Sequence, residues 1–307
     1  MTGLRRADAA AREIATAALG RDPGPMVRAD SGSHEVYVSP DAVLKMIDAA
    51  SHSRLAREIA LAPHLRPGLT APLLGSGLYR VGTHEFRYAC YARVPGAAPG
   101  MGMPGVDGVT ARLLAEQAVW RLARLHSWMP ASHAGQTLRQ PLEHGGFVGQ
   151  TALFAGIESL ATVDMDGTVP RRLLDGLMAI AEHAPPRADS SVPVHADCHW
   201  GNWLACGQNV TALLDFEWAR YGEPVDDWFF LARFSGPHTQ TVLDVIASAT
   251  LVAAETLRAQ CEVRDATYLV SDLLLALERP GLRAGMAGDR LRALEELIGG
   301  RYWWRQA

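Results

Sequence analysis

Residues 194–204 read Val-His-Ala-Asp-Cys-His-Trp-Gly-Asn-Trp-Leu, and residues 212–217 read Ala-Leu-Leu-Asp-Phe-Glu. In the first stretch Asp197 follows a histidine by two residues, and Asn202 comes five residues later. The second stretch is an apolar run that ends in Asp215. The segment Gly207-Gln208-Asn209 between them is typical of a hairpin turn. We therefore predict two short neighbouring strands that bring Asn202 and Asp215 close together.

This spacing suits phosphoryl transfer from a nucleoside triphosphate. An aspartate on a loop can accept the proton of an acceptor hydroxyl, which assigns Asp197 as the base. An asparagine at the end of that loop and an aspartate on the adjacent strand can hold Mg²⁺, which assigns Asn202 and Asp215 as ligands. Without a divalent cation, Asp197 and Asp215 would repel each other and the polyphosphate. The alternative is that these residues only cap turns and a strand end.

Lysine occurs once among the 29 basic side chains, as Lys45 in the strand-like run Ala42-Val43-Leu44-Lys45-Met46-Ile47. Arginine carries a wide flat fork, whereas lysine carries a compact point charge. In a chain this rich in arginine, the single lysine indicates a site that a guanidinium does not fit. The alternative is an ordinary strand lysine that discourages edge pairing.

The pattern along the chain predicts an α+β protein with a small β-rich lobe, residues 1–96, and a larger helical lobe, residues 97–307. A loop rich in Gly and Pro, residues 96–108, begins the second lobe. Strands are expected over residues 26–28, 35–38, 43–47, 71–80 and 84–94, and within a β segment over 192–214. Helices are expected over residues 4–19 and 53–65, in a segment that ends near 126, and over 151–160, 169–183, 240–260, 266–278 and 286–300.

The composition is that of an ordinary globular protein, with 48% hydrophobic and 20% charged residues. We expect no membrane span, because no run of 18 uncharged apolar residues occurs. The net charge of −4 argues against nucleic acid as a partner. The cysteines are scattered, and no secretory signal is evident at the start, so we expect a cytoplasmic protein with reduced thiols, monomeric by default. The four cysteines are Cys90, Cys198, Cys206 and Cys261.

Charge is distributed unevenly between the two predicted lobes. Residues 1–96 carry 12 basic and 9 acidic side chains, a balance of +3. Residues 97–307 carry 17 basic and 24 acidic side chains, a balance of −7. An anionic ligand on the first lobe and a cationic ligand on the second would suit this asymmetry. The alternative is that these charges are simply solvated surface.

From about Pro25 to Trp228 the sequence resembles the aminoglycoside phosphotransferase family of antibiotic kinases, which have a two-lobed protein-kinase-like fold. The catalytic loop of the family has the form H-G-D-x-H-x-x-N and is matched by residues 195–202, with Ala196 in place of the usual glycine. The metal-binding segment has the form D-F-x-x-A-x-x-G-x-P-x-x-D and is matched by residues 215–227. The resemblance implies that Asp197 is the base, that Asn202 and Asp215 bind Mg²⁺, and that Asp227 supports the site.

The resemblance also implies a nucleotide site in the first lobe. Lys45 would contact the α- and β-phosphates and pair with Glu58 from the following helix. The turn Ser31-Gly32-Ser33-His34 would cover the phosphates with backbone N–H groups, although an ordinary hairpin turn fits this segment nearly as well. The adenine would lie against residues 91–95 and bond to the backbone of Ala92 and Val94. ATP is the expected donor, with GTP as the alternative.

The implied activity is an ATP- and Mg²⁺-dependent O-phosphotransferase that acts on a cationic antibiotic, such as an aminoglycoside or a tuberactinomycin-like peptide, and confers resistance. The alternatives are a metabolic small-molecule kinase of the same fold, for choline, a sugar or homoserine, and a nucleotide-binding pseudokinase without turnover. A cationic acceptor needs carboxylates and aromatic faces, and one of two tryptophans, Trp200 or Trp218, is expected to face it. The candidate acceptor residues are His199, Trp200, Glu217, Trp218, Glu223 and Asp226.

Overall fold

The computed structural model describes residues 3–31, 34–51, 53–142, 146–279, 286–300 and 302–304. The chain divides into two compact units. The first comprises residues 1–100, 129–139 and 200–219, and the second comprises residues 101–128, 140–199 and 220–307. The first unit therefore includes residues 129–139 and 200–219, which the predicted division after Gly96 assigns to the second lobe. No helix of the described residues has both the length and the apolar character to cross a membrane.

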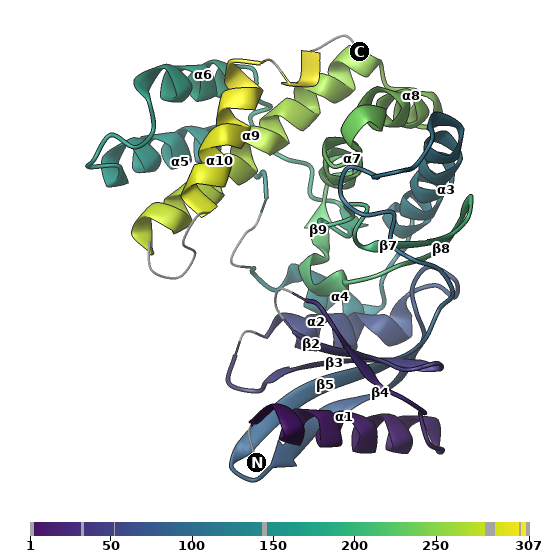
Figure 1. Ribbon diagram of the computed structural model, residues 1–307. Helices are drawn as coiled ribbons and strands as arrows, with labels where there is room; N and C mark the ends of the chain where they lie inside the picture. The colour runs from purple at the N-terminus through teal and green to yellow at the C-terminus, as the bar shows by residue number, and fades with distance from the viewer. Residues whose placement is uncertain are drawn as a thin grey trace. The chain divides into compact units, whose positions relative to one another are not determined.

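The first unit is built on a five-stranded antiparallel sheet with the strand order β1-β2-β3-β5-β4 (Figure 1). Helices α1 (Gly3–Leu19) and α2 (Arg54–Leu61) pack on opposite faces of this sheet. The short helix η1 (Ala62–His64) continues α2. The strands are β1 (Val27–Ala29), β2 (Glu35–Val38), β3 (Ala42–Asp48), β4 (Leu73–Val81) and β5 (His84–Ala92).

Strand β3 shows how the sequence builds the two faces, because successive side chains of a strand point to opposite sides. Leu44 and Met46 are fully buried and pack with the alanine-rich face of α1. Ile47 packs with Leu55 of α2 on the other face. Lys45 lies two residues before Ile47 and therefore shares the face that α2 covers. The same alternation that builds the core thus directs the single lysine toward α2.

The first unit also contains the predicted hairpin, in which β7 (Trp203–Cys206) pairs antiparallel with β8 (Asn209–Leu213). Gly207 in its turn has a φ of +59°, which glycine adopts without strain. The short helix η2 (Phe216–Trp218) follows the hairpin. Helix α4 (Ser132–Arg139), which the sequence pattern did not predict, contacts α2.

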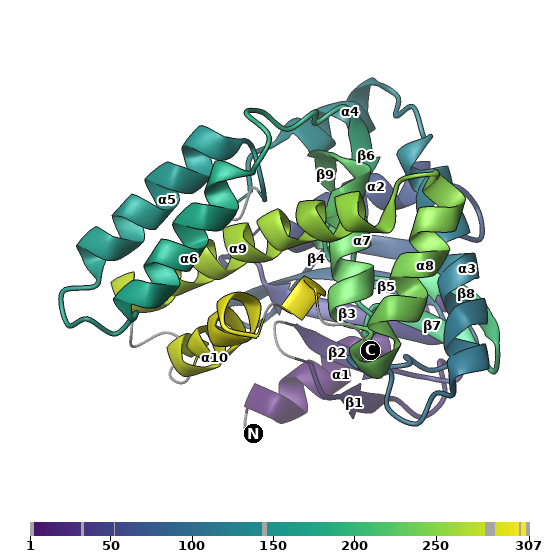
Figure 2. The same ribbon diagram turned by 90° about the horizontal axis from the view of Figure 1, so that it is seen from above.

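The second unit is mainly helical. The long helix α9 contacts α5, α6 and α10, which lie beside it in Figure 2. Strands β6 (Val192–Val194) and β9 (Arg220–Gly222) pair antiparallel. The helices are α3 (Gly108–His126), α5 (Gln150–Val163), α6 (Arg171–Glu182), α7 (Pro224–Arg233), α8 (Thr239–Thr250), α9 (Ala254–Glu278) and α10 (Met286–Ile298), with the short helices η3 (Gly236–His238) and η4 (Tyr302–Trp304).

The helix boundaries after residue 239 differ from those expected. The predicted helix over 240–260 is two helices, because Leu251 has a φ of +58° and ends α8. The predicted helix over 266–278 is the second half of α9. The overall class is nevertheless as predicted, since an antiparallel sheet and a mainly helical part make an α+β protein.

Candidate active site

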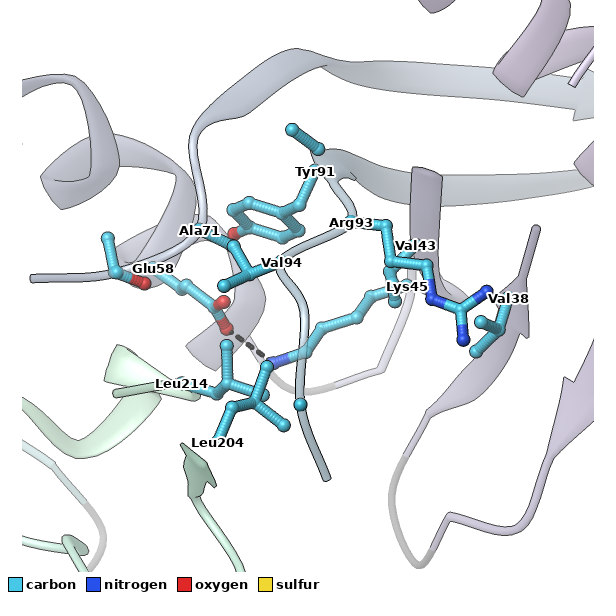
Figure 3. A pocket seen from close by; sticks show the side chains of 13 residues that line it. Val38, Val43, Lys45, Glu58, Ala71, Tyr91, Arg93, Val94, Leu204 and Leu214 are labelled. Carbon is cyan, nitrogen blue, oxygen red and sulfur yellow. Dashed lines mark hydrogen bonds and ion pairs between the residues drawn. The ribbon is translucent and has the colours of Figure 1, made fainter. Parts of the chain in front are cut away.

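Lys45, Glu58 and Asp215 meet in the first unit. The Nζ atom of Lys45 lies 2.8 Å from Oε2 of Glu58 and 3.2 Å from Oδ1 of Asp215. Figure 3 marks the contact between Lys45 and Glu58 with a dashed line. Glu58 faces the sheet together with Leu55, because residues three apart share one face of a helix. The sequence assigned five polar residues to the nucleotide, the base and the metal, namely Lys45, Glu58, Asp197, Asn202 and Asp215. The structure brings three of these together.

A third carboxylate, that of Glu217, joins this cluster. Carboxylate oxygens of Glu58, Asp215 and Glu217 lie within 4.8 Å of one another. Burial lowers the pKa of Lys45, but the three carboxylates outweigh it and hold that pKa above its ordinary value. Burial also raises the pKa of Glu58, and Asp215 and Glu217 add to this effect against the opposing influence of Lys45. The cluster thus has an excess of negative charge, and its oxygen ligands suit Mg²⁺.

The hairpin brings the two predicted metal ligands to one end. The backbone N–H of Leu214 donates to the carbonyl of Asn202 at 2.8 Å, next to the paired residues Trp203 and Leu213. Asn202 therefore comes just before β7, and Asp215 comes just after β8. Asp215 has a φ of +67°, a left-handed conformation that aspartate tolerates better than most residues. This conformation turns the chain from β8 directly into η2.

An apolar pocket of about 260 Å³ lies in the first unit beside Lys45 and Glu58 (Figure 3). The backbone N–H of Ala92 already donates to the carbonyl of Pro72 at 2.8 Å. The backbone N–H of Arg93 donates to the backbone carbonyl of Asp41 at 2.9 Å. The pocket is lined by Val38, Val43, Lys45, Glu58, Thr70, Ala71, Tyr91, Ala92, Arg93, Val94, Gly96, Leu204 and Leu214.

The predicted phosphate-covering turn is described only at its two ends. Ser31 is exposed, whereas Gly32 and Ser33 lie outside the described residues. His34 is buried, and its Nε2 atom lies 2.8 Å from Oε1 of Glu217. The expected place of Glu217 beside an acceptor is not supported, because its buried carboxylate faces His34 within the first unit.

In the second unit, Asp227 holds the loop that carries Asp197. Its carboxylate accepts the backbone N–H of His195 at 3.1 Å and that of Ala196 at 2.7 Å. The Nε2 atom of His126 lies 2.9 Å from Asp227 Oδ2. Burial raises the pKa of Asp227, but the hydrogen bond with His126 and the other partners lower it further, so the net pKa is below its ordinary value. Asp227 is therefore a charged anchor inside the unit.

The loop that carries Asp197 has a strained backbone at Ala196, and the next residue, Asp197, has a partly exposed side chain. Ala196 has a φ of +62°, in the region that favours glycine. The N–H of Asp197 donates to Nδ1 of His195 at 3.3 Å. The side chain of Asp197 is 24% exposed, and its Oδ1 atom lies 3.7 Å from Nε2 of His199. Asp197 is thus fixed through its backbone while its carboxylate stays accessible.

Two candidate acceptor carboxylates are already neutralised within the second unit. Asp226 is buried, with Arg220 at 3.0 Å and Arg264 at 3.2 Å. Glu223 also forms an ion pair with Arg264. A buried carboxylate with two guanidinium partners has no exposed charge to offer a ligand. The expected role of Asp226 in acceptor binding is therefore not supported.

The candidate aromatic residues differ in their surroundings. Trp200 is fully buried and packs against Trp203 at a ring distance of 6.2 Å, so the structure does not support it as an acceptor contact. The guanidinium of Arg54 lies over the Trp218 ring at 4.6 Å. The ring of His199 packs edge-on against Phe234 at 5.8 Å, which agrees with a role in orienting its loop.

Sequence reasoning missed Arg57 and His126. Arg57 is buried on α2 and donates to the backbone carbonyls of Thr137, at 2.8 Å, and Ala219, at 3.0 Å. His126 is 101 residues away from Asp227 along the chain, and no motif connects the two. The sequence offered one signal for Arg57. It directly precedes Glu58, and a helix that turns Glu58 toward the sheet also buries residues next to it.

Together the antiparallel unit with its Lys–Glu pair and the helical unit with its H-x-D loop define a kinase-like phosphotransferase. The sequence model of the phosphotransferase enzyme family matches residues 27–265, and the chain therefore belongs to this family. It is a phosphotransferase. The family expected from the sequence is thereby confirmed. No curated protein sequence gives a significant match.

Solved structures confirm the kinase-like fold. The GDP complex of aminoglycoside 2'-phosphotransferase-IIIa is 18% identical with a TM-score of 0.73, and the match covers 96% of this chain and 99% of that one. Macrolide 2'-phosphotransferase MphH from Brachybacterium faecium is 20% identical with a TM-score of 0.63, covering 93% and 97%. A thermostable mutant of aminoglycoside phosphotransferase APH(4)-Ia, bound to AMP-PNP and hygromycin B, is 15% identical with a TM-score of 0.62, covering 94% and 98%.

Proposed function

We propose that this protein transfers the γ-phosphoryl group of ATP to a hydroxyl of a cationic antibiotic, of the aminoglycoside or tuberactinomycin type, as a monomer in the cytoplasm. The observation that carries the proposal is the cluster of Lys45, Glu58 and Asp215 beside an apolar pocket in the same unit. A structural neighbour in complex with AMP-PNP and hygromycin B and another with kanamycin support ATP and a cationic antibiotic, whereas neighbours in complex with GDP support the alternative donor. GTP is the alternative donor.

The pocket suits the base of the nucleotide. Some of its apolar side chains come from β2 and β3, and others come from the β7–β8 hairpin and the residue that follows it. Because the Ala92 N–H is bonded to Pro72, a base would find the Ala92 carbonyl and the Val94 N–H. With the base there, the phosphates would extend toward the Lys45 ammonium, which Glu58 holds in place.

Mg²⁺ fits the acidic end of the cluster. Asp215 and Asn202 would hold the ion, which supplies positive charge against the triphosphate when bound. Glu217 lies near enough to add a third oxygen donor. The excess of carboxylates over the single ammonium supports this assignment.

Asp197 would act on the acceptor. Its carboxylate takes the hydroxyl proton as the acceptor oxygen forms a bond to the γ-phosphorus and the bond to the leaving diphosphate breaks. Asp227 keeps the loop in position through the backbone N–H groups of His195 and Ala196. The acidic excess of residues 97–307, with 24 acidic against 17 basic side chains, favours a cationic acceptor.

The test is coupled nucleotide consumption with a panel of aminoglycosides, tuberactinomycin-type peptides, macrolides and hygromycin-like compounds. Asp197→Ala should lower turnover by roughly 10²–10⁴-fold while nucleotide affinity stays nearly unchanged, because the variant loses only the base. Retained turnover in Asp197→Ala would remove this residue as the base. A wild-type protein that consumes no nucleotide with any acceptor would instead indicate a pseudokinase.

A resistance assay in a sensitive host separates the antibiotic kinase from a metabolic kinase of the same fold. Expression of the wild type should raise the inhibitory concentration of the antibiotic that is turned over, and expression of Asp197→Ala should not. Turnover of choline, a sugar or homoserine without any resistance would contradict the antibiotic assignment.

A further inference from the structure

Three half-buried aromatic rings follow one another beside the loop that carries Asp197. Phe234 contacts the ring of His199 at 5.8 Å, and the Nε2 atom of His199 lies 3.7 Å from Oδ1 of Asp197. Phe230 stacks on Phe234 at 6.1 Å, and Tyr268 meets Phe230 edge-on at 5.1 Å. We call Phe234, Phe230 and Tyr268 the aromatic row. One end of the row therefore lies close to the proposed base, with His199 between them.

Two helices and the core behind them hold the aromatic row in place. Phe230 lies in the last turn of α7, and Phe234 directly follows that helix. Tyr268 lies on α9, which contacts α7 and is seen beside it in Figure 2. The buried Phe229 stacks almost parallel on Tyr268, at 5.4 Å and 8°. The rings are thus partly exposed surfaces with a packed backing, which a ligand can contact without first ordering them.

Tyr268 adds a neutral ring to the aromatic row. Its hydroxyl accepts a hydrogen bond from Arg220 at 3.3 Å. Burial raises the pKa of Tyr268 to about 12, although Arg220 opposes this effect. The phenol is therefore uncharged near pH 7, and the row presents rings without a charge of its own.

Three carboxylates on or next to α7 and α9 are already paired with arginines. Asp226 and Glu223 both form ion pairs with Arg264. Asp265 forms an ion pair with Arg233 at 2.9 Å. A cationic acceptor gains little from carboxylates that are already paired, whereas an aromatic face attracts cations and also packs against C–H groups.

We propose that the aromatic row is the surface that binds the acceptor beside Asp197. The proposal rests on the proposed function and narrows its substrate class. The acceptor is a cationic antibiotic with a C–H-rich or aromatic face next to the phosphorylated hydroxyl. With that hydroxyl at Asp197, the adjoining face extends over Phe234 and Phe230, and its cationic groups lie against rings rather than carboxylates.

The experiment uses the full chain and the panel compound that the wild type turns over with the highest kcat/KM, titrated at saturating ATP. The variants Phe234→Ala and Phe230→Ala should each raise KM for that acceptor about tenfold, because each removes a ring face. The expected change in kcat is less than about threefold, and KM for ATP should stay within about twofold of the wild type. Thermal melting shows whether each variant is folded.

Conservative and matched variants complete the design. Phe234→Tyr and Tyr268→Phe keep the aromatic rings and should leave KM for the acceptor within about threefold of the wild type. Phe86 on β5 is half-buried like the rings of the row but belongs to the first unit. Phe86→Ala should leave KM for the acceptor unchanged.

Ionic strength separates ring contacts from ion pairs in the unmodified protein. The Debye length falls from about 10 Å at 0.1 M salt to about 3 Å at 1 M, which weakens exposed ion pairs most. KM of the wild type for the acceptor should therefore rise less than about threefold over this range of KCl. This measurement does not depend on the folding of a variant.

Two outcomes would overturn the proposal and leave the proposed function standing. One is an unchanged KM for the acceptor in folded Phe234→Ala and Phe230→Ala. The other is a larger rise of the wild-type KM over the same salt range, which would show recognition through carboxylates. A wild-type protein that turns over no compound of the panel would overturn this proposal together with the proposed function.

Discussion

The side chain of Lys45 is the point where charge, size and position all matter. Its ammonium lies within 3.2 Å of two carboxylates, and the Lys45 side chain is only 15% exposed. A guanidinium is wider and flatter than an ammonium, and it cannot occupy this place without displacing Glu58 or Asp215. The use of lysine here, in a chain that otherwise uses arginine, has a direct structural reason.

Lys45→Arg is predicted to lower kcat/KM by at least about 100-fold although the charge is kept, because the fork misplaces the charge relative to the phosphates. Steady-state kinetics with ATP check this. Arg80→Lys on the exposed part of β4 is the matched control and should change nothing. A Lys45→Arg enzyme with normal kinetics would contradict the role of the lysine.

Ala196 has a backbone conformation that costs free energy. At a φ of +62° its Cβ atom crowds the backbone, at a cost of roughly 1–2 kcal/mol. Ala196→Gly is therefore predicted to raise the free energy of unfolding by about 0.5–1 kcal/mol, after allowance for the greater freedom of glycine in the unfolded chain. Urea denaturation measures the change.

The control for Ala196→Gly is the same substitution at a position inside a helix. Ala9 lies in the exposed face of α1, and Ala9→Gly should lower the free energy of unfolding by about 1 kcal/mol. Equal destabilisation by both changes would show that the backbone at Ala196 is relaxed in solution.

At the level of elements, the sequence was informative where its pattern is local. The apolar run in residues 42–47 and the Gly207 turn are short-range signals, and both the strand and the hairpin are confirmed. Helix α4 was missed because it is short and has only eight residues, including a glycine. The break between α8 and α9 was missed because Leu251 is an apolar residue that gives no turn signal, although its φ is positive.

Arg57 connects three elements of the first unit, since it belongs to α2 and donates to carbonyls in α4 and after η2. Arg57→Ala leaves two buried carbonyl groups without this donor and is predicted to lower the free energy of unfolding by about 2–3 kcal/mol. Urea denaturation checks this against Arg66→Ala, an exposed arginine, for which a change below about 0.5 kcal/mol is expected. Equal effects in both variants would show that the two hydrogen bonds contribute nothing.

For the molecule as a whole, the motif residues could be predicted from the sequence, whereas the distant residues that hold these motifs in place could not. The motifs around Asp197 and Asp215 are contiguous, so their residue types and spacing carry the information. The partners of Asp227 and Asp226 come from distant helices, since His126 lies on α3 and Arg264 lies on α9. Long-range pairs of this kind depend on how helices pack, which a single sequence does not reveal.

The anchor at Asp227 makes stability depend on pH. Because its pKa is lowered in the folded form from the ordinary 3.8, the folded protein holds this proton less tightly than the unfolded chain. The resulting stabilisation is present above about pH 4 and is lost as the pH falls through the folded pKa. The difference in unfolding free energy between wild type and Asp227→Asn should therefore shrink below about pH 4.

Urea denaturation over a series of pH values measures this difference. Asp189→Asn, at an exposed position, serves as control and should show no such trend. A difference between wild type and Asp227→Asn that stays constant down to pH 3 would mean that Asp227 is not the charged anchor described above.

The scarcity of lysine gives the protein an unusual chemical property. Acylating reagents find a single side-chain amine in the whole chain, that of Lys45, apart from the terminal amino group. One added mass on the peptide that contains residue 45 would therefore report directly on this position, with no background from other lysines. Protection of that peptide by a nucleotide would count occupied molecules, and the natural sequence already serves as a single-label probe of its own binding site.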